Sequence, residues 1–390
     1  MSFASRLGCA AVATALAVAG ACGERDELPS KALVHIPRDA GEDGFDAGNH
    51  TGPPGLDAAG LCGNQIHKAV TNAPNVYFVL DSSGSMSAPA PNASSRYEAV
   101  RIAVVDLARK LGPLINVGAA RFPINASDQN PCHVGGEVMP ITPGTPKDPQ
   151  TGKDGATTFQ LAQATSATPF GGTPTGKTLA ALLPELSELT GKTIVLLATD
   201  GGPNCNPLAS CSAAECMFNI EGDPNCGAVN CCSTSGPYGA DGPLSCIDHD
   251  PTVDAVAALA DAGIDVYVIG IPGSEIYSDV LDDMALAGGV ALATSPNYYR
   301  VDDLDQLQSV LGAIASVVVS CEFDLVDAPP DPGMTNVYID GVILPSSYAN
   351  GWTWKSETVI QFNGEACVRL KNGQIGQVQI VSGCPTEIAK

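Results

Sequence analysis

The chain has 390 residues, which is enough for a substantial core and for more than one domain. It carries 42 acidic against 19 basic residues, a formal net charge of −23 at pH 7. Nucleic-acid binding depends on Lys and Arg side chains that neutralise phosphates, so this balance argues against a nucleic-acid partner and indicates a soluble, self-repelling surface.

The first residues have the pattern of an export signal. Arg6 precedes an apolar run of small residues from Leu7 to Ala21, which ends at Cys22. Small residues directly before a cysteine resemble a bacterial lipoprotein signal, in which residues 1–21 are removed and Cys22 is lipidated. Cleavage by an ordinary signal peptidase near the same place is the alternative. Both predict an exported protein, and no later stretch reaches the ~20 apolar residues that a membrane span needs.

Residues 22–61 are rich in Asp, Gly and Pro and lack sustained periodicity. Such a segment cannot bury enough apolar surface to order itself, so we expect a disordered tether. The tether would hold a folded domain away from its anchor.

From residue 62 onward, short apolar runs alternate with segments of helical periodicity. The runs predict buried strands at 76–80, 114–122, 192–198 and 264–270, an edge strand at 135–141 and a short strand at 297–301. Apolar residues at helical spacing predict helices over 97–111, 179–189, 253–262 and 304–318. Pro184 is expected to kink or restart the second of these helices. The alternation predicts an α/β fold over residues 62–320, with a doubly wound, mostly parallel sheet covered by helices on both faces.

From Cys321 the pattern changes to a period of two with hairpin turns. Asp340-Gly341 separates two apolar runs, and Asn372-Gly373 follows another. We therefore expect a small antiparallel β module over residues 321–390. Trp352 and Trp354 lie two apart on a predicted strand and face the same way; core packing is the default, and an exposed partner surface is the alternative.

Oxygen-bearing side chains gather at one edge of the predicted sheet. Asp81, Ser83 and Ser85 follow the first strand, Thr173 lies in a Gly-Gly-Thr-Pro-Thr loop before a helix, and Asp200 follows another buried strand. Open α/β sheets bind ligands at the carboxyl ends of their strands. Hard oxygen donors with few carboxylates suit Mg²⁺ or Mn²⁺, and Ca²⁺ is also compatible.

These motifs, in this order, resemble those of the von Willebrand factor A domain, the fold shared with integrin I domains, over residues 70–320. In that family the five matching positions form a metal-ion-dependent adhesion site. The resemblance implies that Ser83, Ser85 and Thr173 offer hydroxyls to the metal, while Asp81 and Asp200 act largely through bound water. Neutral hydroxyls leave the ion under-neutralised, so an open coordination position would attract a carboxylate from a partner.

Residues 171–178 also match the P-loop pattern for nucleoside triphosphates, with Lys177 in the lysine position. A P-loop must leave a buried strand, but residues 162–169 do not form one. Asp200 is already accounted for by the metal site. Nucleotide binding is therefore disfavoured, and Lys177 is expected to be an exposed helix residue.

The 14 cysteines indicate a disulfide framework. Apart from Cys9 in the export signal and the lipidation candidate Cys22, 12 cysteines remain, an even number in an exported protein. An insert at 203–250 holds seven of them: Cys205, Cys211, Cys216, Cys226, Cys231, Cys232 and Cys246. This insert should be a loop that is held by disulfides and rises over the metal face. Either it is a cap that determines which ligands reach the ion, or it is a stabilised loop that binds no partner. Zinc binding with His133 or His249 is disfavoured where disulfides form.

Seven is an odd number, so one insert cysteine must pair elsewhere, and Cys132 is the candidate. Cys62 and Cys321 flank the A-like domain, whose termini lie close together in the family fold. The resemblance therefore implies a Cys62–Cys321 pair, with Cys367–Cys384 inside the β module. The sequence does not choose among the pairings of the other eight.

Enzyme signatures in the sequence are poor. The five histidines (His35, His50, His67, His133 and His249) have no HExxH spacing, and no G-x-S-x-G occurs. The leading hypothesis is a non-enzymatic, metal-dependent adhesion or ligand-binding lipoprotein of the outer membrane or cell surface. Its partner would be a protein or glycan with an exposed carboxylate.

Two alternatives stay open. The first is a structural envelope protein in which the metal only stabilises the fold, and the second is an exported enzyme or nucleotide-binding protein. The A-like domain with its trailing β module also looks like exported A-domain lipoproteins of myxobacteria.

Overall fold

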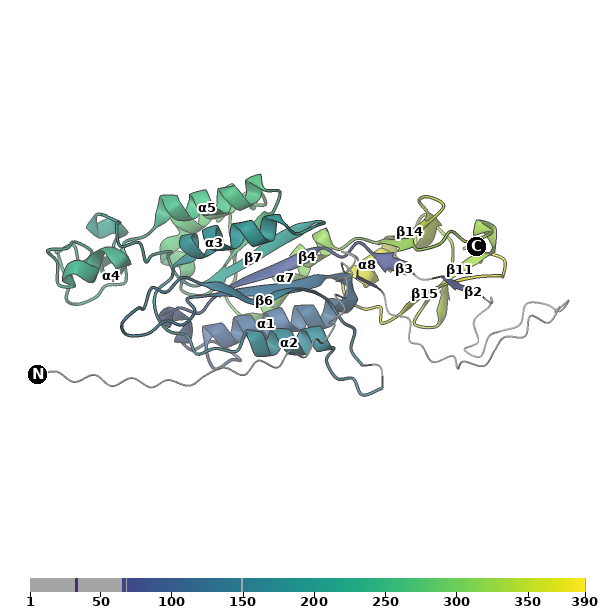
Figure 1. Cartoon of the computed structure of the whole chain (residues 1–390), viewed down its shortest axis with the longest axis horizontal. Coiled ribbons are helices and arrows are strands. Elements are labelled where there is room, and N and C mark those ends of the chain that lie inside the picture. Colours follow the sequence, from purple (N-terminus) through teal and green to yellow (C-terminus); the bar gives the residue numbers. More distant parts are fainter. Residues whose placement is uncertain (1–31, 34–64, 68, 149, 390) are drawn as a thin grey trace, which may run out of the picture.

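The computed structural model describes residues 32–33, 65–67, 69–148 and 150–389. The predicted signal peptide, the lipidation candidate Cys22, Cys62 and most of the predicted tether lie outside these ranges. The described residues form an α/β domain and a β module that lie end to end along the long axis of the molecule (Figure 1).

A six-stranded sheet forms the centre of the α/β domain, with strand order β6-β5-β4-β7-β8-β9. Its strands are β4 (Asn75–Asp81), β5 (Asn116–Phe122), β6 (Gly136–Pro143), β7 (Thr193–Thr199), β8 (Asp265–Gly270) and β9 (Tyr299–Arg300). All neighbouring pairs are parallel except β5 and β6, which are antiparallel at one edge. The predicted α/β fold with a mostly parallel sheet is confirmed, and every predicted strand of this sheet is present.

Helices cover both faces of the sheet (Figure 1). On one face lie α1 (Arg96–Leu111), α2 (Ala156–Ala164) and α7 (Leu304–Val318), and on the other lie α3 (Thr175–Ser187), α5 (His249–Asp261) and α6 (Ser278–Ala287). All seven residues of β4 are buried. Val76, Phe78 and Leu80 pack with α1 and α7, while Tyr77 and Val79 pack with α3, α5 and α6. This double burial explains why the strand is a continuous apolar run.

Two helices of this domain were not predicted. Only Leu161 of the short helix α2 is a buried large apolar residue, so its periodicity is weak. Helix α6 does carry helical spacing, because Val280, Leu281 and Met284 all face the core. Helix α3 continues through Pro184 to Ser187, so of the predicted kink or restart at that proline the restart does not occur.

The β module contains two antiparallel sheets. One has the order β1-β3-β10-β14-β13 and the other β12-β11-β15-β2. Their bounds are β1 (Ala32–Leu33), β2 (Gln65–His67), β3 (Ala69–Thr71), β10 (Glu322–Leu325), β11 (Thr335–Ile339), β12 (Val342–Leu344), β13 (Gly351–Trp354), β14 (Val359–Asn363) and β15 (Val378–Ser382). The predicted antiparallel module is confirmed. So is its hairpin at Asp340-Gly341, where both residues have positive φ (50° and 77°) as a tight two-residue turn requires.

The module differs from the prediction in two respects. Residues 364–371 form a helix, α8 (Gly364–Lys371), because Ala366 and Leu370 bury one helical face; the hairpin expected at Asn372-Gly373 is wrong. Residues 65–71 lie within the range predicted for the A-like domain but supply β2 and β3 to the sheets of the module. The α/β domain is thus inserted between β3 and β10. Trp352 is buried and stacks edge-on with Trp354, which is the core packing expected.

The disulfides of the module also differ from the prediction. Cys321 pairs with Cys367 on α8, and Cys384 is disulfide-bonded as well, so the predicted pairs Cys62–Cys321 and Cys367–Cys384 are both wrong. The physical reason is helix α8. It brings the Cα of Cys367 within 5.5 Å of that of Cys321, next to the start of β10.

The remaining helical segments are short. The insert contains α4 (Met217–Ile220), and 3₁₀ turns lie at Gly84–Ser87, Gly112–Leu114, Ala213–Glu215, Gly239–Ser245, Ser274–Tyr277 and Pro332–Met334. Among the residues that the structure describes, no helix combines the length and the apolar character needed to cross a membrane.

Candidate metal centre

The first part of the site is the end of strand β4. Asp81 is the last residue of this strand and is fully buried (0% exposed). One carboxylate oxygen, Oδ1, accepts a hydrogen bond from the backbone N–H of Ser83 at 2.8 Å. The other, Oδ2, accepts one from the hydroxyl of Thr199 at 2.5 Å. Both oxygens are thus held by protein donors, which fixes the orientation of the carboxylate.

Three hydroxyls meet beside this carboxylate. The Oγ atoms of Ser83 and Ser85 lie 3.1 Å apart. A Cβ atom built on Gly201 would lie 3.7 Å from Ser85 Oγ and 3.8 Å from Thr173 Oγ1, so both hydroxyls adjoin the same point above this glycine. The three predicted hydroxyl ligands therefore come together in space, although Thr173 is far from the two serines in sequence.

Backbone hydrogen bonds hold the two ligand loops against each other. The N–H of Gly84 donates to the carbonyl of Gly171 at 2.8 Å, and the N–H of Phe170 donates to the carbonyl of Ser82 at 2.9 Å. These bonds set the spacing between Thr173 and the serines without using any hydroxyl that could bind an ion.

Asp200 completes the set, directly after strand β7. Its Oδ1 accepts a hydrogen bond from Ser85 Oγ at 2.7 Å, and its Oδ2 lies 2.6 Å from Nη1 of Arg96. Burial raises the pKa of Asp200 above its ordinary value, against the opposing hydrogen bonds from Ser85 and Arg96. Burial, and then the negative charge of Asp200, raise the pKa of Asp81 as well.

Two buried carboxylates in one site, with one guanidinium beside Asp200, suit an added cation. Burying charge is unfavourable unless opposite charge is supplied nearby. Asp81, Ser83, Thr173 and Asp200 are all buried, whereas Ser85 is exposed. The donor set of three hydroxyls and two carboxylates fits Mg²⁺ or Mn²⁺, and the open side lies at Ser85.

Sequence reasoning missed four residues of this site. Thr199 orients Asp81, Arg96 pairs with Asp200, and Gly201 leaves room beside the hydroxyls. Asn204 holds Thr173 through its side chain. Thr199 and Gly201 belong to the Thr-Asp-Gly motif and could have been found there. Neither Arg96 nor Asn204 carries a local signal.

The cysteine-rich insert is fastened directly to the ligand loop. Cys132 pairs with Cys205, as predicted, and a Cβ built on Gly172 would lie 2.5 Å from Cys205 Sγ and 3.2 Å from Cys132 Sγ. A cleft of about 370 Å³ borders this disulfide, lined among others by Asp128, Lys177 and Asp241. Helix α4 lies beyond the carboxyl ends of the strands (Figure 1). The insert thus borders the metal face but leaves Ser85 exposed.

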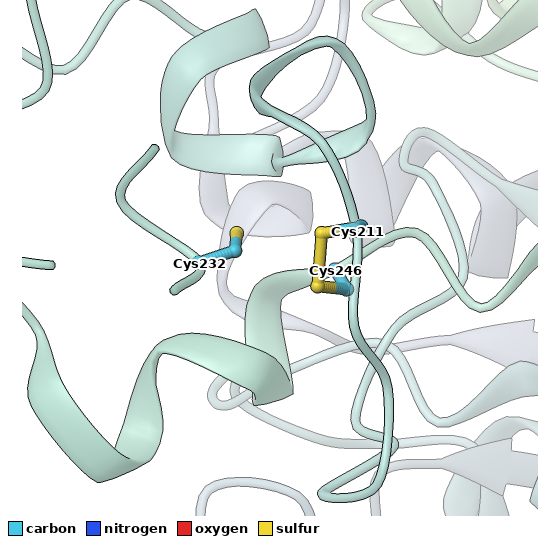
Figure 2. A group of neighbouring side chains, drawn as sticks. All are labelled: Cys211, Cys232 and Cys246. Atoms are coloured by element: carbon cyan, nitrogen blue, oxygen red, sulfur yellow. A yellow bond between two sulfur atoms is a disulfide. The ribbon is translucent and has the colours of Figure 1, made fainter. Parts of the chain in front are cut away.

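Three further disulfides hold the insert itself: Cys211–Cys246, Cys216–Cys232 and Cys226–Cys231. Figure 2 shows the sulfur of Cys232 beside the Cys211–Cys246 bridge, and the three sulfurs lie within 4.8 Å of one another. All three are bonded in disulfides, so they offer no thiolate to zinc. His249 lies instead between Asp250 and Asp283, with ring nitrogens 2.8 and 2.9 Å from their carboxylates.

The P-loop pattern lacks its structural context. The residues between the end of α2 at Ala164 and the start of α3 at Thr175 form no strand. Lys177 is half-buried, not exposed as we expected, and its Nζ donates to the carbonyl of Cys205 at 2.6 Å. The lysine therefore fastens α3 to the insert.

Comparisons with protein-family models and with curated proteins find no match for the chain. Among solved structures it is similar to the pilus adhesin SpaC from Lactobacillus rhamnosus GG (18% identity, TM-score 0.44), over 79% of this chain and 38% of that one. It is also similar to the vWF domain of the type V pili tip protein Mfa5 from Porphyromonas gingivalis (15%, TM-score 0.42; 64% and 96% covered). Manganese-loaded TRAP protein of Plasmodium vivax is another such structure (14%, TM-score 0.36; 76% and 96% covered). The chain spans about two fifths of the length of SpaC.

The mostly parallel sheet, the helices on both faces and the motifs at the carboxyl ends of β4 and β7 all agree with the resemblance inferred from the sequence. The α/β domain therefore has the fold that this resemblance predicts.

Proposed function

We propose that the chain is a metal-ion-dependent adhesion or ligand-binding protein of the cell envelope. In this proposal Ser83, Ser85 and Thr173 hold a Mg²⁺ or Mn²⁺ ion, and Asp81 and Asp200 support it through water. When bound, the ion would supply a Lewis-acidic position for an acidic group of a protein or glycan partner. The observation that carries the proposal is the meeting of three hydroxyls and two buried carboxylates at one sheet edge, with Ser85 exposed.

The hydrogen bonds of the site favour ligand binding over a purely structural ion. Both oxygens of Asp81 and both oxygens of Asp200 already have protein donors. The carboxylates therefore need no ion to satisfy their hydrogen bonds, and the hydroxyls are the groups left to face it. An ion held by neutral hydroxyls keeps most of its charge and attracts an anion.

The disulfides support an exported location. Five pairs are present among the described residues, and such bonds persist in oxidising compartments. We propose that Cys22 carries the lipid anchor of the mature protein. Globomycin-sensitive processing and metabolic labelling with a tagged fatty acid, each lost in Cys22→Ala, would test the anchor.

The ligand-binding proposal is tested by capture of partners from an envelope extract on the immobilised protein. Capture should occur with Mg²⁺ or Mn²⁺ and be lost with EDTA, and the double variant Asp81→Ala/Thr173→Ala should abolish it. Ser87→Ala is the matched control, because it removes an exposed hydroxyl two residues from Ser85 that donates a hydrogen bond to the carbonyl of Gly84. If the double variant lowers stability yet captures the same partners, the structural alternative replaces this proposal.

A further inference from the structure

Arg96 occupies an unfavourable place for a cation. It is the first residue of helix α1, directly after the N-cap Ser95. The positive end of the helix dipole disfavours a positive side chain in this first turn. The guanidinium instead crosses to the carboxylate of Asp200, at 2.6 Å, where the aspartate side chain has no exposed surface. A basic residue in this position therefore needs the buried carboxylate as its partner.

The surrounding backbone is built to fit this guanidinium. Gly273, in the loop after β8, has φ of 111°, a conformation that other residues rarely adopt. A Cβ atom there would lie 2.5 Å from Nη1 and 2.9 Å from Cζ of Arg96. The glycine lets the loop backbone approach the guanidinium, so the ion pair is held from both α1 and β8.

Charge counting shows what Arg96 changes. Asp81 and Asp200 bring two negative charges to the site, and Arg96 compensates one of them. With a divalent ion added, the site has a net charge of plus one; without Arg96 it would be neutral. A guanidinium this close to Asp200 therefore repels the ion and attracts an anion that approaches the ion.

We propose that Arg96 sets the charge of the metal centre. Its positive charge weakens the affinity of the centre for the divalent cation and strengthens the affinity for the carboxylate that the cation binds. Arg96 is thus a positioning residue that acts through Asp200 and not a ligand. This inference rests on the proposed function, since it assumes that the site binds a divalent ion.

The test compares the intact protein with Arg96→Met and Arg96→Lys. Mn²⁺ affinity is measured from the electron paramagnetic resonance of free Mn²⁺, and acetate binding to the Mn²⁺-loaded site from the water-proton relaxation rate. We expect R96M to bind Mn²⁺ about tenfold tighter and acetate several-fold more weakly, because one charge is removed near the ion. R96K keeps the charge and should restore both affinities toward those of the unchanged protein.

A merely structural ion pair would give a different result. If the ion pair is only structural, its loss in R96M should lower the melting temperature in EDTA and weaken Mn²⁺ binding. The affinities for Mn²⁺ and for acetate would then not change in opposite directions. Should R96M fail to fold, Gly273→Ala provides the second variant, because its methyl group displaces the guanidinium while keeping the charge in the protein. G273A should shift the affinities for Mn²⁺ and acetate in the directions expected for R96M, by smaller factors. Mn²⁺ binding that R96M or G273A leaves unchanged overturns the inference alone. Absence of Mn²⁺ binding in the unchanged protein overturns the proposed function as well.

Discussion

Asn204 and Thr173 hold each other through two hydrogen bonds, one in each direction. The backbone N–H of Thr173 donates to Asn204 Oδ1 at 2.7 Å, and the backbone N–H of Asn204 donates to the Thr173 carbonyl at 2.9 Å. Asn204 is the residue before the Cys132–Cys205 disulfide, which anchors the insert. The start of the insert and the ligand loop are therefore one hydrogen-bonded unit, and the insert helps to fix the position of Thr173 in the candidate metal centre.

Asn204→Ala should destabilise the ligand loop. The buried N–H of Thr173 would lose its acceptor, which costs about 1–3 kcal/mol. We expect a corresponding decrease in the free energy of unfolding, measured with denaturant in EDTA, and a weaker Mn²⁺ affinity. Asn206→Ala is the control, because that side chain donates to Asp248 and accepts from the backbone N–H of Leu208. Equal effects of the two variants on Mn²⁺ affinity would contradict the role given to Asn204.

Removing the hydroxyl of Thr173 should affect the ion more than the fold. Thr173→Val keeps the shape of this buried side chain and deletes the oxygen, so we expect Mn²⁺ affinity to fall at least about tenfold, or about 1.4 kcal/mol. Thr173→Ser retains the hydroxyl and should keep most of the affinity. Calorimetric titration with Mn²⁺ measures both. A Val variant that binds Mn²⁺ as tightly as the unchanged protein would remove Thr173 from the site.

The part of the fold that sequence predicts best is the buried sheet and its ligand edge. Strands β4, β7 and β8 are continuous apolar runs because helices cover both of their faces, and this pattern is visible locally. The motif spacing at the ends of β4 and β7 likewise places Asp81 and Asp200 at one edge. In these strands the local sequence pattern is enough to predict the tertiary environment.

The parts that sequence did not predict depend on distant partners. His67 in β2 pairs with Ile380 in β15, and the whole α/β domain lies between these two residues in the sequence. A strand of three residues, such as β2, is also too short to show periodicity. Helix α8 was read as a hairpin because the Asn372-Gly373 signal that ends it is also a turn signal. Once α8 is a helix, Cys367 meets Cys321. The wrong prediction of a Cys367–Cys384 pair thus follows from the wrong element prediction.

The disulfide of Cys384 provides a prediction of its own. Ser382, two residues before it, is the strand partner of Gln65, and Cys62 lies three residues before Gln65 in the sequence. We therefore expect non-reducing peptide mapping to join Cys384 to Cys62 and Cys321 to Cys367. The insert serves as an internal control, since the same map should join Cys132 to Cys205. A peptide linking Cys62 to any insert cysteine would contradict this assignment.

The stability of the β module should depend on His67. This residue is buried, and its ring nitrogen Nε2 lies 2.8 Å from the hydroxyl of Ser382. Burial lowers the pKa of His67 below its ordinary value of 6.5, against the opposing charge and hydrogen bond of Asp327. Below pH 6.5 the unfolded chain therefore binds a proton that the folded module excludes. Stability falls as the pH is lowered through this value and levels off below the folded pKa.

His67→Gln isolates this contribution, since glutamine can still hydrogen-bond to Ser382 but does not titrate. We expect the melting temperature to fall less between pH 7.5 and pH 5 in the variant than in the unchanged protein. His249→Gln is the matched control: Asp250 and Asp283 outweigh partial burial and raise the pKa of His249. His249→Gln should therefore lose stabilisation at low pH, so its melting temperature should fall more than that of the unchanged protein as the pH is lowered. Parallel melting curves for unchanged protein and His67→Gln over this range would show that His67 titrates alike in the folded and unfolded chains.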